Sequence, residues 1–236
     1  AGGVESMTVS PMTWEGKMNP RAGSCQEAAD CLIPMGITSE NVSEQFGMTR
    51  EDQDAFSARS HHKAAAARAA GKFKSEIVPV ATVLKDAEGN AKNVVISEDD
   101  GIRPETTAAG LAKLKPSFKK GGSTTAGSSS QTTDGAAAVL MMTRREALNR
   151  GLPIKAIFRS FAVAGVPPRI MGVGPVYAIP KAVAAAGLTL DDIDVFEINE
   201  AFASQALYSV RTLGIDEAKV NPNGGAIALG HPLGAT

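Results

Sequence analysis

The chain has 236 residues, of which 43% are hydrophobic and 21% are charged, a composition that excludes intrinsic disorder and predicts a buried core. Its formal charge of −1 gives no sign of a basic nucleic-acid-binding surface, and no apolar run approaches the ~18 residues of a membrane span. Cys25 and Cys31 are too few for a disulfide framework and fit no zinc-site pattern, which favours a reducing compartment and no metal site.

The two ends of the sequence are unusual for natural termini. Ala1–Met7 has the pattern of a buried strand and starts without an initiator methionine or a signal sequence. Gly230–Thr236 is a Gly- and Pro-containing loop that leads toward a predicted helix. We therefore expect the sequence to be an internal fragment of a longer chain, from which no targeting signal can be read.

Residues 8–34 are predicted to be loop, because prolines and glycines interrupt every periodic pattern there. Ile37–Phe46 is typical of a short amphipathic helix. Thr49-Arg-Glu-Asp52 has the spacing of a capping box, which marks the start of a helix. We expect this longer helix to run through an alanine-rich stretch to Ala70 and to end at Gly71.

Two β-rich runs come next in the chain. Glu76–Leu84 and Asn93–Ser97 flank Asp86–Asn90, whose residues are typical of a hairpin turn. A short helical stretch is predicted around Leu111 and Leu114. The sequence thus predicts a β-hairpin followed by a short helix.

Gly121–Ser130 consists mostly of glycine, serine and threonine, which leaves two interpretations open. Such a composition is usual for a flexible linker. The segment, however, leads directly into Asp134–Met142, which has the pattern of a buried strand. A shaped binding loop is therefore a serious alternative.

The rest of the chain alternates between predicted strands and helices. Helices are expected to open at Thr143-Arg-Arg-Glu146, Gly174-Pro175 and Glu200, and to end at Gly151, Gly187 and Gly214; strands are expected over Pro153–Val163 and Ile193–Ile198. This alternation predicts an α/β layer structure. Residues 8–131 do not share it and are predicted to be an insertion.

Three histidines are candidates for chemistry. His61 and His62 lie in mid-helix among alanines, where a solvated helical face explains them, and we set them aside. His231 lies in a glycine-rich loop before a predicted helix, whose N-terminal partial charge would favour neutral imidazole. Such an imidazole could accept a proton from a nucleophile or donate to an oxyanion. The alternative is a histidine simply held in its loop by hydrogen bonds.

Asn199 is the second candidate, because it opens the segment Asn199-Glu-Ala-Phe202 after a predicted strand. Ligands of α/β sheets gather at the carboxyl ends of strands, which points to a site there. Asn199 could equally be the N-cap of the following helix. Spacing alone leaves both interpretations open.

Short motifs along the whole chain point to one family. They are Gly2–Met7, Met35–Asn41, Glu76–Pro79, Ala112–Pro116, Thr125–Gly127, Asp134–Ala137, Met171–Pro175, Asn199–Phe202 and Asn223–Pro232. Together they resemble the thiolase family. The stretches Cys31–Asn41 and Ala164–Pro168 look most like its peroxisomal 3-ketoacyl-CoA branch.

The resemblance implies a fold class and a domain plan. The fold is α/β, with the layered halves of a thiolase-like fold and an inserted loop domain. Residues 1–7 and 132–151 would be remnants of the N-terminal half. Residues 8–131 would form the inserted, CoA-binding loop domain, and residues 152–236 a truncated C-terminal half.

The resemblance also implies an activity, namely thiolytic cleavage of 3-ketoacyl-CoA by CoA in peroxisomal fatty-acid β-oxidation. The products are acetyl-CoA and a shortened acyl-CoA, with coenzyme A as a substrate and no cofactor. A homodimer is expected, with the edge near Val4–Met7 in its contact. The alternatives are a biosynthetic acetoacetyl-CoA thiolase and a non-catalytic acyl-CoA- or lipid-binding relative.

The catalytic residues that carry over by resemblance are His231 and Asn199. His231 would activate a nucleophilic cysteine and contribute to an oxyanion hole, while Asn199 would hold a water that is the other donor. The family's two catalytic cysteines would lie upstream of Ala1 and downstream of Thr236. Because Cys25 and Cys31 match neither context, we expect this fragment alone to be inactive.

The resemblance further assigns residues to the substrate and CoA site. Arg103 would pack on the CoA nucleotide, and Ser130 would contact the pantetheine amide. Phe118 and Ala126 would line the same channel. The alternative for Arg103 is an exposed surface charge, and for Phe118 simple core packing.

Two more positions complete this predicted site. Met35 would border the thioester pocket, and Phe202 belongs to the same substrate-binding group. For Met35, as for Phe118, packing in an apolar core is the alternative.

Overall fold

The computed structural model describes residues 1–10 and 18–236, so the predicted loop character of residues 11–17 lies outside the described residues. Its helices and strands, in chain order, are β1 (Gly2–Glu5), α1 (Gln26–Asp30), α2 (Met35–Phe46), α3 (Arg50–Ala69), β2 (Val80–Lys85), β3 (Ala91–Ile96), α4 (Ala108–Leu111), β4 (Gly135–Ala138), α5 (Arg144–Asn149), α6 (Gly174–Ala185), α7 (Ala203–Leu213) and α8 (Ala226–Leu229). Within the described ranges, no helix has both the length and the apolar character needed to cross a membrane.

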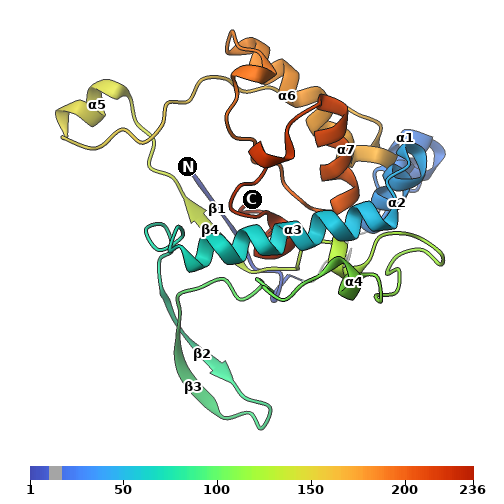
Figure 1. Ribbon diagram of the computed structural model, residues 1–236, viewed down its shortest axis with the longest axis horizontal. Helices are drawn as coiled ribbons and strands as arrows, with labels where there is room; N and C mark the ends of the chain where they lie inside the picture. Colours follow the sequence, from blue (N-terminus) through green and yellow to red (C-terminus); the bar gives the residue numbers. More distant parts are fainter. Residues whose placement is uncertain (11–17) are drawn as a thin grey trace.

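The two helices α2 and α3 confirm the helices predicted there. α2 ends at Gly47, whose φ of 67° is left-handed and therefore suits glycine. α3 begins after Thr49, whose side chain accepts a hydrogen bond of 3.1 Å from the Asp52 N–H. It is followed by Gly71 with a φ of 70°. The long α3 crosses the middle of the molecule (Figure 1).

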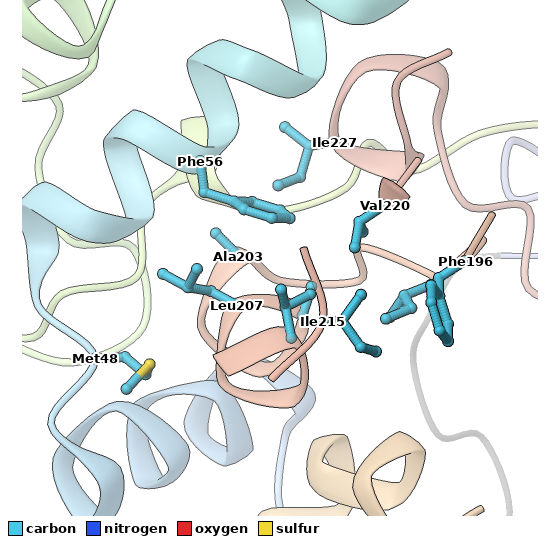
Figure 2. Close-up of a cluster of buried hydrophobic side chains, with 11 residues drawn as sticks. Met48, Phe56, Phe196, Ala203, Leu207, Ile215, Val220 and Ile227 are labelled. Carbon is cyan, nitrogen blue, oxygen red and sulfur yellow. The ribbon is translucent and has the colours of Figure 1, made fainter. Parts of the chain in front are cut away.

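The main core lies between α3, α7 and the segments on either side of α7. Figure 2 shows that Phe56 from α3 points toward Leu207 of α7 and Ile227 of α8. The buried members are Met48, Phe56, Phe196, Ile198, Ala203, Ala206, Leu207, Val210, Ile215, Val220 and Ile227. Burying a side chain such as Leu207 contributes about 1.5–3 kcal/mol, so this cluster fixes α7 against α3.

The described strands form two antiparallel pairs, β1 with β4 and β2 with β3. The hairpin predicted around Asp86–Asn90 is confirmed, and the Asp86 carboxylate accepts the N–H groups of Glu88 and Asn90 at its turn. In Figure 1 this hairpin projects away from the rest of the molecule. β1 pairs with β4 with Val4 opposite Ala136, which joins the first residues to the segment after residue 130.

Three of the strand predictions are wrong in this structure. Asp134–Met142 was expected to be a buried strand, but only Gly135–Ala138 is strand and its side chains face solvent. Pro153–Val163 forms no strand, and Phe158 and Phe161 are 70% and 76% exposed. Ile193–Ile198 contributes only a single bridge, from Phe196 to Val220. A strand needs a hydrogen-bonded neighbour: Gly135–Ala138 has one in β1 and Phe196 has one in Val220, but the described residues place none beside Pro153–Val163.

The helix predictions in the second half of the chain agree with the structure more closely than the strand predictions do. α5 starts after Thr143, whose side chain accepts from the Glu146 N–H, and α6 has Pro175 in its first turn. α7 ends at Gly214 as predicted but begins at Ala203, later than the expected Glu200. Its N-cap is Phe202, so the interpretation of Asn199 as a helix N-cap is wrong.

Candidate active site

Asn199 and His231 meet in the structure. The Asn199 amide nitrogen Nδ2 lies 3.3 Å from the His231 ring nitrogen Nε2. Asn199 comes from the turn before α7, and His231 from the segment after α8. The two residues that the sequence singled out for chemistry are therefore neighbours.

The backbone around Asn199 is held on both sides. Asn221 accepts from the Ile198 N–H through Oδ1 and donates to the Ile198 carbonyl through Nδ2, each at 2.8 Å. The Gln205 side chain donates to the Asn199 carbonyl at 2.7 Å. Asn221 has a φ of 44°, a left-handed conformation that asparagine tolerates better than most residues. These hydrogen bonds fix the main chain of Ile198 and Asn199, and with it the position of the Asn199 Cα atom.

Glu200 connects the segment around Asn199 with α3 and with α8, the short helix that precedes His231. Its buried carboxylate accepts from Ser60 Oγ at 2.6 Å, from Asn221 Nδ2 at 2.8 Å and from the Ile227 N–H at 3.3 Å. A Cβ at Gly225 would overlap this carboxyl group. Burial raises the pKa of Glu200, while the hydrogen bonds from Ser60 and Asn221 lower it. Sequence reasoning missed this residue, because only its burial by distant segments distinguishes it from the nearby, exposed Glu197.

His231 is half-buried and held by its neighbours. Its Nδ1 lies 2.8 Å from Thr236 Oγ1, and its N–H donates to the Gln131 carbonyl at 3.3 Å. Burial lowers the pKa of His231, which favours the neutral ring. His231 follows the C-terminal end of α8, and the Thr236 N–H donates to the Pro232 carbonyl in the turn after it. Its position at the N-terminus of a following helix stays a prediction, and the lowered pKa is explained by burial.

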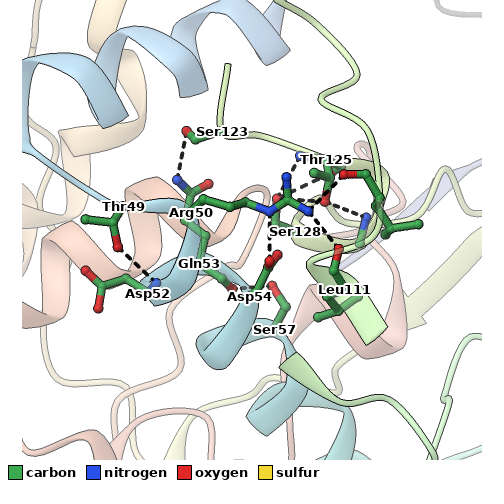
Figure 3. Close-up of polar contacts among 12 residues, drawn as sticks. Thr49, Arg50, Asp52, Gln53, Asp54, Ser57, Leu111, Ser123, Thr125 and Ser128 are labelled. Carbon is green, nitrogen blue, oxygen red and sulfur yellow. Dashed lines mark hydrogen bonds and ion pairs between the residues drawn. The ribbon is translucent and has the colours of Figure 1, made fainter. Parts of the chain in front are cut away.

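The segment Gly121–Ser130 is a shaped loop, and the linker interpretation is wrong. Thr124, Thr125 and Ser128 are buried, and Thr125 and Ser128 exchange hydrogen bonds with each other. The Gln53 side chain of α3 donates to Ser123 Oγ at 3.0 Å (Figure 3).

The acid that holds this loop is Glu40 of α2. Its carboxylate accepts the backbone N–H groups of Ser123 and Thr124, each at 2.9 Å. The buried hydroxyl of Ser39 bonds to both Thr124 and Ser204, at 2.8 and 2.7 Å. α2 thereby connects the loop to the first turn of α7.

The end of the loop lies against the segment that carries Asn199. The Ser130 N–H donates to the Ala201 carbonyl at 3.0 Å, and Ser129 forms a bridge with Phe202. Phe118 packs edge-on against Phe202, with ring centroids 5.9 Å apart. The structure therefore brings Ser130, Phe118 and Phe202 together beside Asn199.

Three of the predicted site residues, Phe118, Met35 and Ala126, are exposed. Phe118 is 42% exposed and Met35 is 45% exposed, so core packing does not explain them. A Cβ at Gly36, next to Met35, would overlap the Phe118 ring, which places these positions side by side. Ala126 is also exposed, at the start of the short turn in the loop.

Arg103 is exposed, and its backbone lies against α3 at His61. Its backbone N–H donates to His61 Nδ1 at 3.2 Å. His61 is only 3% exposed, so the interpretation of both histidines as a solvated face is wrong for His61 and holds for the exposed His62.

Both cysteines of the chain lie at the ends of α1. Cys25 and Cys31 flank α1 and are exposed, and Figure 1 shows α1 at the edge of the molecule, away from the C-terminal end. Among residues 1–10 and 18–236, no group of three or more His, Cys, Asp or Glu side chains is arranged to hold a metal ion.

Comparison with known families gives matches to both parts of the chain. The family model of the N-terminal domain of thiolase matches residues 1–145, and that of the C-terminal domain matches residues 152–236.

Curated relatives match nearly the whole chain. It is 60% identical to the peroxisomal 3-ketoacyl-CoA thiolase 2 of Arabidopsis thaliana, over 99% of this chain and 51% of the relative. It is 61% identical to peroxisomal 3-ketoacyl-CoA thiolase B of Rattus norvegicus, over 99% of this chain and 55% of the relative. The chain thus spans about half the length of the curated relatives it matches.

Solved structures agree with these matches. The dimeric peroxisomal thiolase of Saccharomyces cerevisiae has a TM-score of 0.90 and 49% identity, covering 100% of this chain and 59% of that one. Human mitochondrial 3-ketoacyl-CoA thiolase has a TM-score of 0.83 and 38% identity, covering 99% of this chain and 61% of that one. The predicted layered α/β fold is confirmed.

Proposed function

Because this chain belongs to the thiolase family, we propose that the whole protein carrying it is a 3-ketoacyl-CoA thiolase of fatty-acid β-oxidation. It cleaves a 3-ketoacyl-CoA with CoA and releases acetyl-CoA and a shortened acyl-CoA. The observation that carries this proposal is the pair of Asn199 and His231, 3.3 Å apart, beside the loop that ends in Ser130. Relatives named peroxisomal at about 60% identity support a peroxisomal location.

His231 is the proposed general base. We assign its proton to Nδ1, which donates to Thr236 Oγ1, so that the Nε2 lone pair is available. Nε2 takes the proton from a cysteine thiol, which neither Cys25 nor Cys31 supplies and which belongs elsewhere in the whole protein. The thiolate attacks the 3-keto carbon, and its carbonyl electrons form an oxyanion.

The oxyanion is where Asn199 and the protonated His231 contribute. The imidazolium Nε2–H and the Asn199 amide, directly or through a water, lie on one side of the site and can donate to the developing charge. When the oxyanion collapses, the C2–C3 bond breaks and its electron pair leaves as the acetyl-CoA enolate. The enolate takes a proton from the thiol of the family's second catalytic cysteine, which is expected downstream of Thr236. The acyl group stays as a thioester on the cysteine until the thiolate of incoming CoA attacks it and the cysteine leaves.

The remaining predicted residues are proposed to bind the acyl-CoA. Ser130 hydrogen-bonds the pantetheine amide, and Phe118 and Phe202 line its path with the exposed Met35 and Ala126. Support comes from the exposure of Phe118, Met35 and Ala126 and from the docking of Ser130 against Ala201. Arg103 packs on the nucleotide, a task that suits a planar guanidinium.

A homodimer is proposed for the whole protein. The yeast peroxisomal thiolase that this chain resembles is described as dimeric. β1 exposes Val4 at a strand edge, which supports a contact through this part of the chain.

Replacement of His231 tests the proposal. In the whole protein, His231→Ala should slow acylation of the catalytic cysteine by about 100-fold or more, because removing a positioned base costs about 10²–10⁴ in rate. CoA affinity should change little. Rapid-quench measurement of the acyl-enzyme, with 3-ketoacyl-CoA substrates of short and long chain, checks both points. An unchanged acylation rate would refute the role of His231, and turnover of the shortest substrate alone would favour a biosynthetic acetoacetyl-CoA thiolase.

A further inference from the structure

The main chain that carries Arg103 is held at successive residues. The Gln131 side chain donates to the Gly101 carbonyl at 3.0 Å. The Ile102 side chain is buried with Ala64 of α3 and Ala228 of α8. The Arg103 N–H donates to His61 Nδ1 at 3.2 Å. The exposed guanidinium therefore projects from a backbone that α3 and α8 hold in place.

Of these three contacts, the one made by His61 involves the Arg103 backbone directly. It lies on α3 and is buried, whereas its neighbour His62 is exposed. A ring nitrogen accepts a hydrogen bond only when it carries no proton. The bond from the Arg103 N–H thus requires a neutral His61 with its proton on Nε2.

We propose that His61 is a positioning residue that holds the Arg103 main chain so that the guanidinium reaches the CoA nucleotide. This inference rests on the proposed role of Arg103 in binding CoA. His61 touches neither the substrate nor the reacting atoms. It acts through the backbone of Arg103, and CoA binding therefore depends on its protonation.

Acidification breaks this arrangement. When Nδ1 gains a proton it becomes a donor that faces the donor N–H of Arg103, so the bond is lost. Burial lowers the pKa of His61, the charges of Arg103 and His62 lower it further, and Glu105 raises it. The segment is therefore held at neutral pH and is released as the pH falls through the lowered pKa, and CoA binding weakens in the same direction.

Three variants of the whole protein test this inference. His61→Asn keeps an acceptor, because asparagine Oδ1 lies as far from Cα as the imidazole Nδ1 and does not titrate. His61→Leu removes the acceptor and keeps an apolar volume. His62→Asn is the matched control on the exposed neighbour. We would measure kcat, the KM for CoA, and calorimetric binding of a CoA analogue without the thiol between about pH 5 and pH 8, where histidine titrates.

The expected result separates binding from chemistry. His61→Leu should raise the KM for CoA at pH 8 by about 3- to 10-fold, the factor for loss of one hydrogen bond, with kcat nearly unchanged. His61→Asn should bind CoA like the unmodified protein at pH 8 and should lack the extra loss of affinity at pH 5. His62→Asn should keep the loss of affinity on acidification, moved slightly toward higher pH because it removes a charge that lowers the pKa of His61.

Two results would overturn the inference. One is a folded His61→Leu variant with unchanged CoA affinity. The other is a His61→Asn variant that still loses affinity on acidification as the unmodified protein does, and this readout remains if His61→Leu does not fold. Arg103→Ala separates the two proposals: if it leaves CoA affinity unchanged, the role of Arg103 has failed, whatever the His61 variants show.

Discussion

The buried carboxyl group of Glu200 accepts hydrogen bonds from three parts of the site. Ser60 belongs to α3, Asn221 flanks Ile198 and Asn199, and Ile227 belongs to α8, which leads to His231. Side-chain positions at a catalytic site must be held within a fraction of an ångström, and buried bonds of this kind supply that precision. Glu200 therefore supports both Asn199 and His231 without facing the substrate.

Replacing Glu200 should lower the free energy of unfolding by more than replacing an exposed glutamate does. Glu200→Ala leaves one of the two Asn221 amide hydrogens and the Ile227 N–H without an acceptor, at a cost of about 1–3 kcal/mol for each. Glu200→Gln keeps one acceptor oxygen and should lose about 1 kcal/mol. Urea unfolding checks both values, with the exposed Glu197→Ala as control. A loss for Glu200→Ala no larger than for the control would contradict the assignment.

The pH dependence of this stabilisation has a defined sign. Burial raises the pKa of Glu200 above its unfolded value, so the folded protein binds more protons than the unfolded chain near that pH. The contribution of Glu200 is therefore complete below its unfolded pKa and is lost as the pH rises through the folded pKa. The free energy of unfolding of Glu200→Gln, which does not titrate, should lack this decline.

Individual residues differ in how far the sequence could predict them. Asn199 and His231 stand in short motifs, so their meeting could be expected from a resemblance. The roles of Glu200 and His61 depend on burial created by segments that are 140 and 42 residues away in the chain. A single sequence carries no local sign of such burial, which is why His61 was assigned to a solvated face.

Helices and strands also differ in how far the sequence could predict them. α2, α3, α5 and α6 were predicted because caps and terminating glycines are local signals. Pro153–Val163 has a strand-like apolar pattern, but the described residues give it no hydrogen-bonding neighbour. Pairing is a property of two segments, so the pattern of one of them cannot decide it.

The N-cap of α3 provides a test at this scale. Thr49→Ala removes the acceptor of the Asp52 N–H and should lower the free energy of unfolding by about 1 kcal/mol. Asp52 also pairs with Arg211 of α7, so a loosened first turn of α3 affects both helices. Thr143→Ala makes the same change at α5, which projects from the molecule in Figure 1, and should leave global unfolding nearly unchanged. Equal effects in calorimetry would contradict the central role of α3.

At the scale of the whole molecule, residues 1–236 hold a base and a donor but no suitably placed thiol. Cys25 and Cys31 flank the peripheral α1. These residues by themselves should therefore show no thiolase activity, because loss of a nucleophile removes about 10⁶ of rate in well-studied hydrolases. A coupled assay of acetoacetyl-CoA thiolysis checks this. Turnover that is abolished by Cys31→Ala would show that the nucleophile had been wrongly placed outside this chain.

The site is assembled from segments that lie far apart along the chain. Ser39 meets Ser204 across 165 positions, and Ser60 meets Glu200 across 140. Contacts of such high sequence separation require closure of long loops, and they form slowly compared with helices. During synthesis from the N-terminus, α2 and α3 leave the ribosome long before the residues that complete their polar contacts. Until those residues arrive, Glu40, Ser60 and His61 face water, and the nascent chain has helices but no place for its substrate.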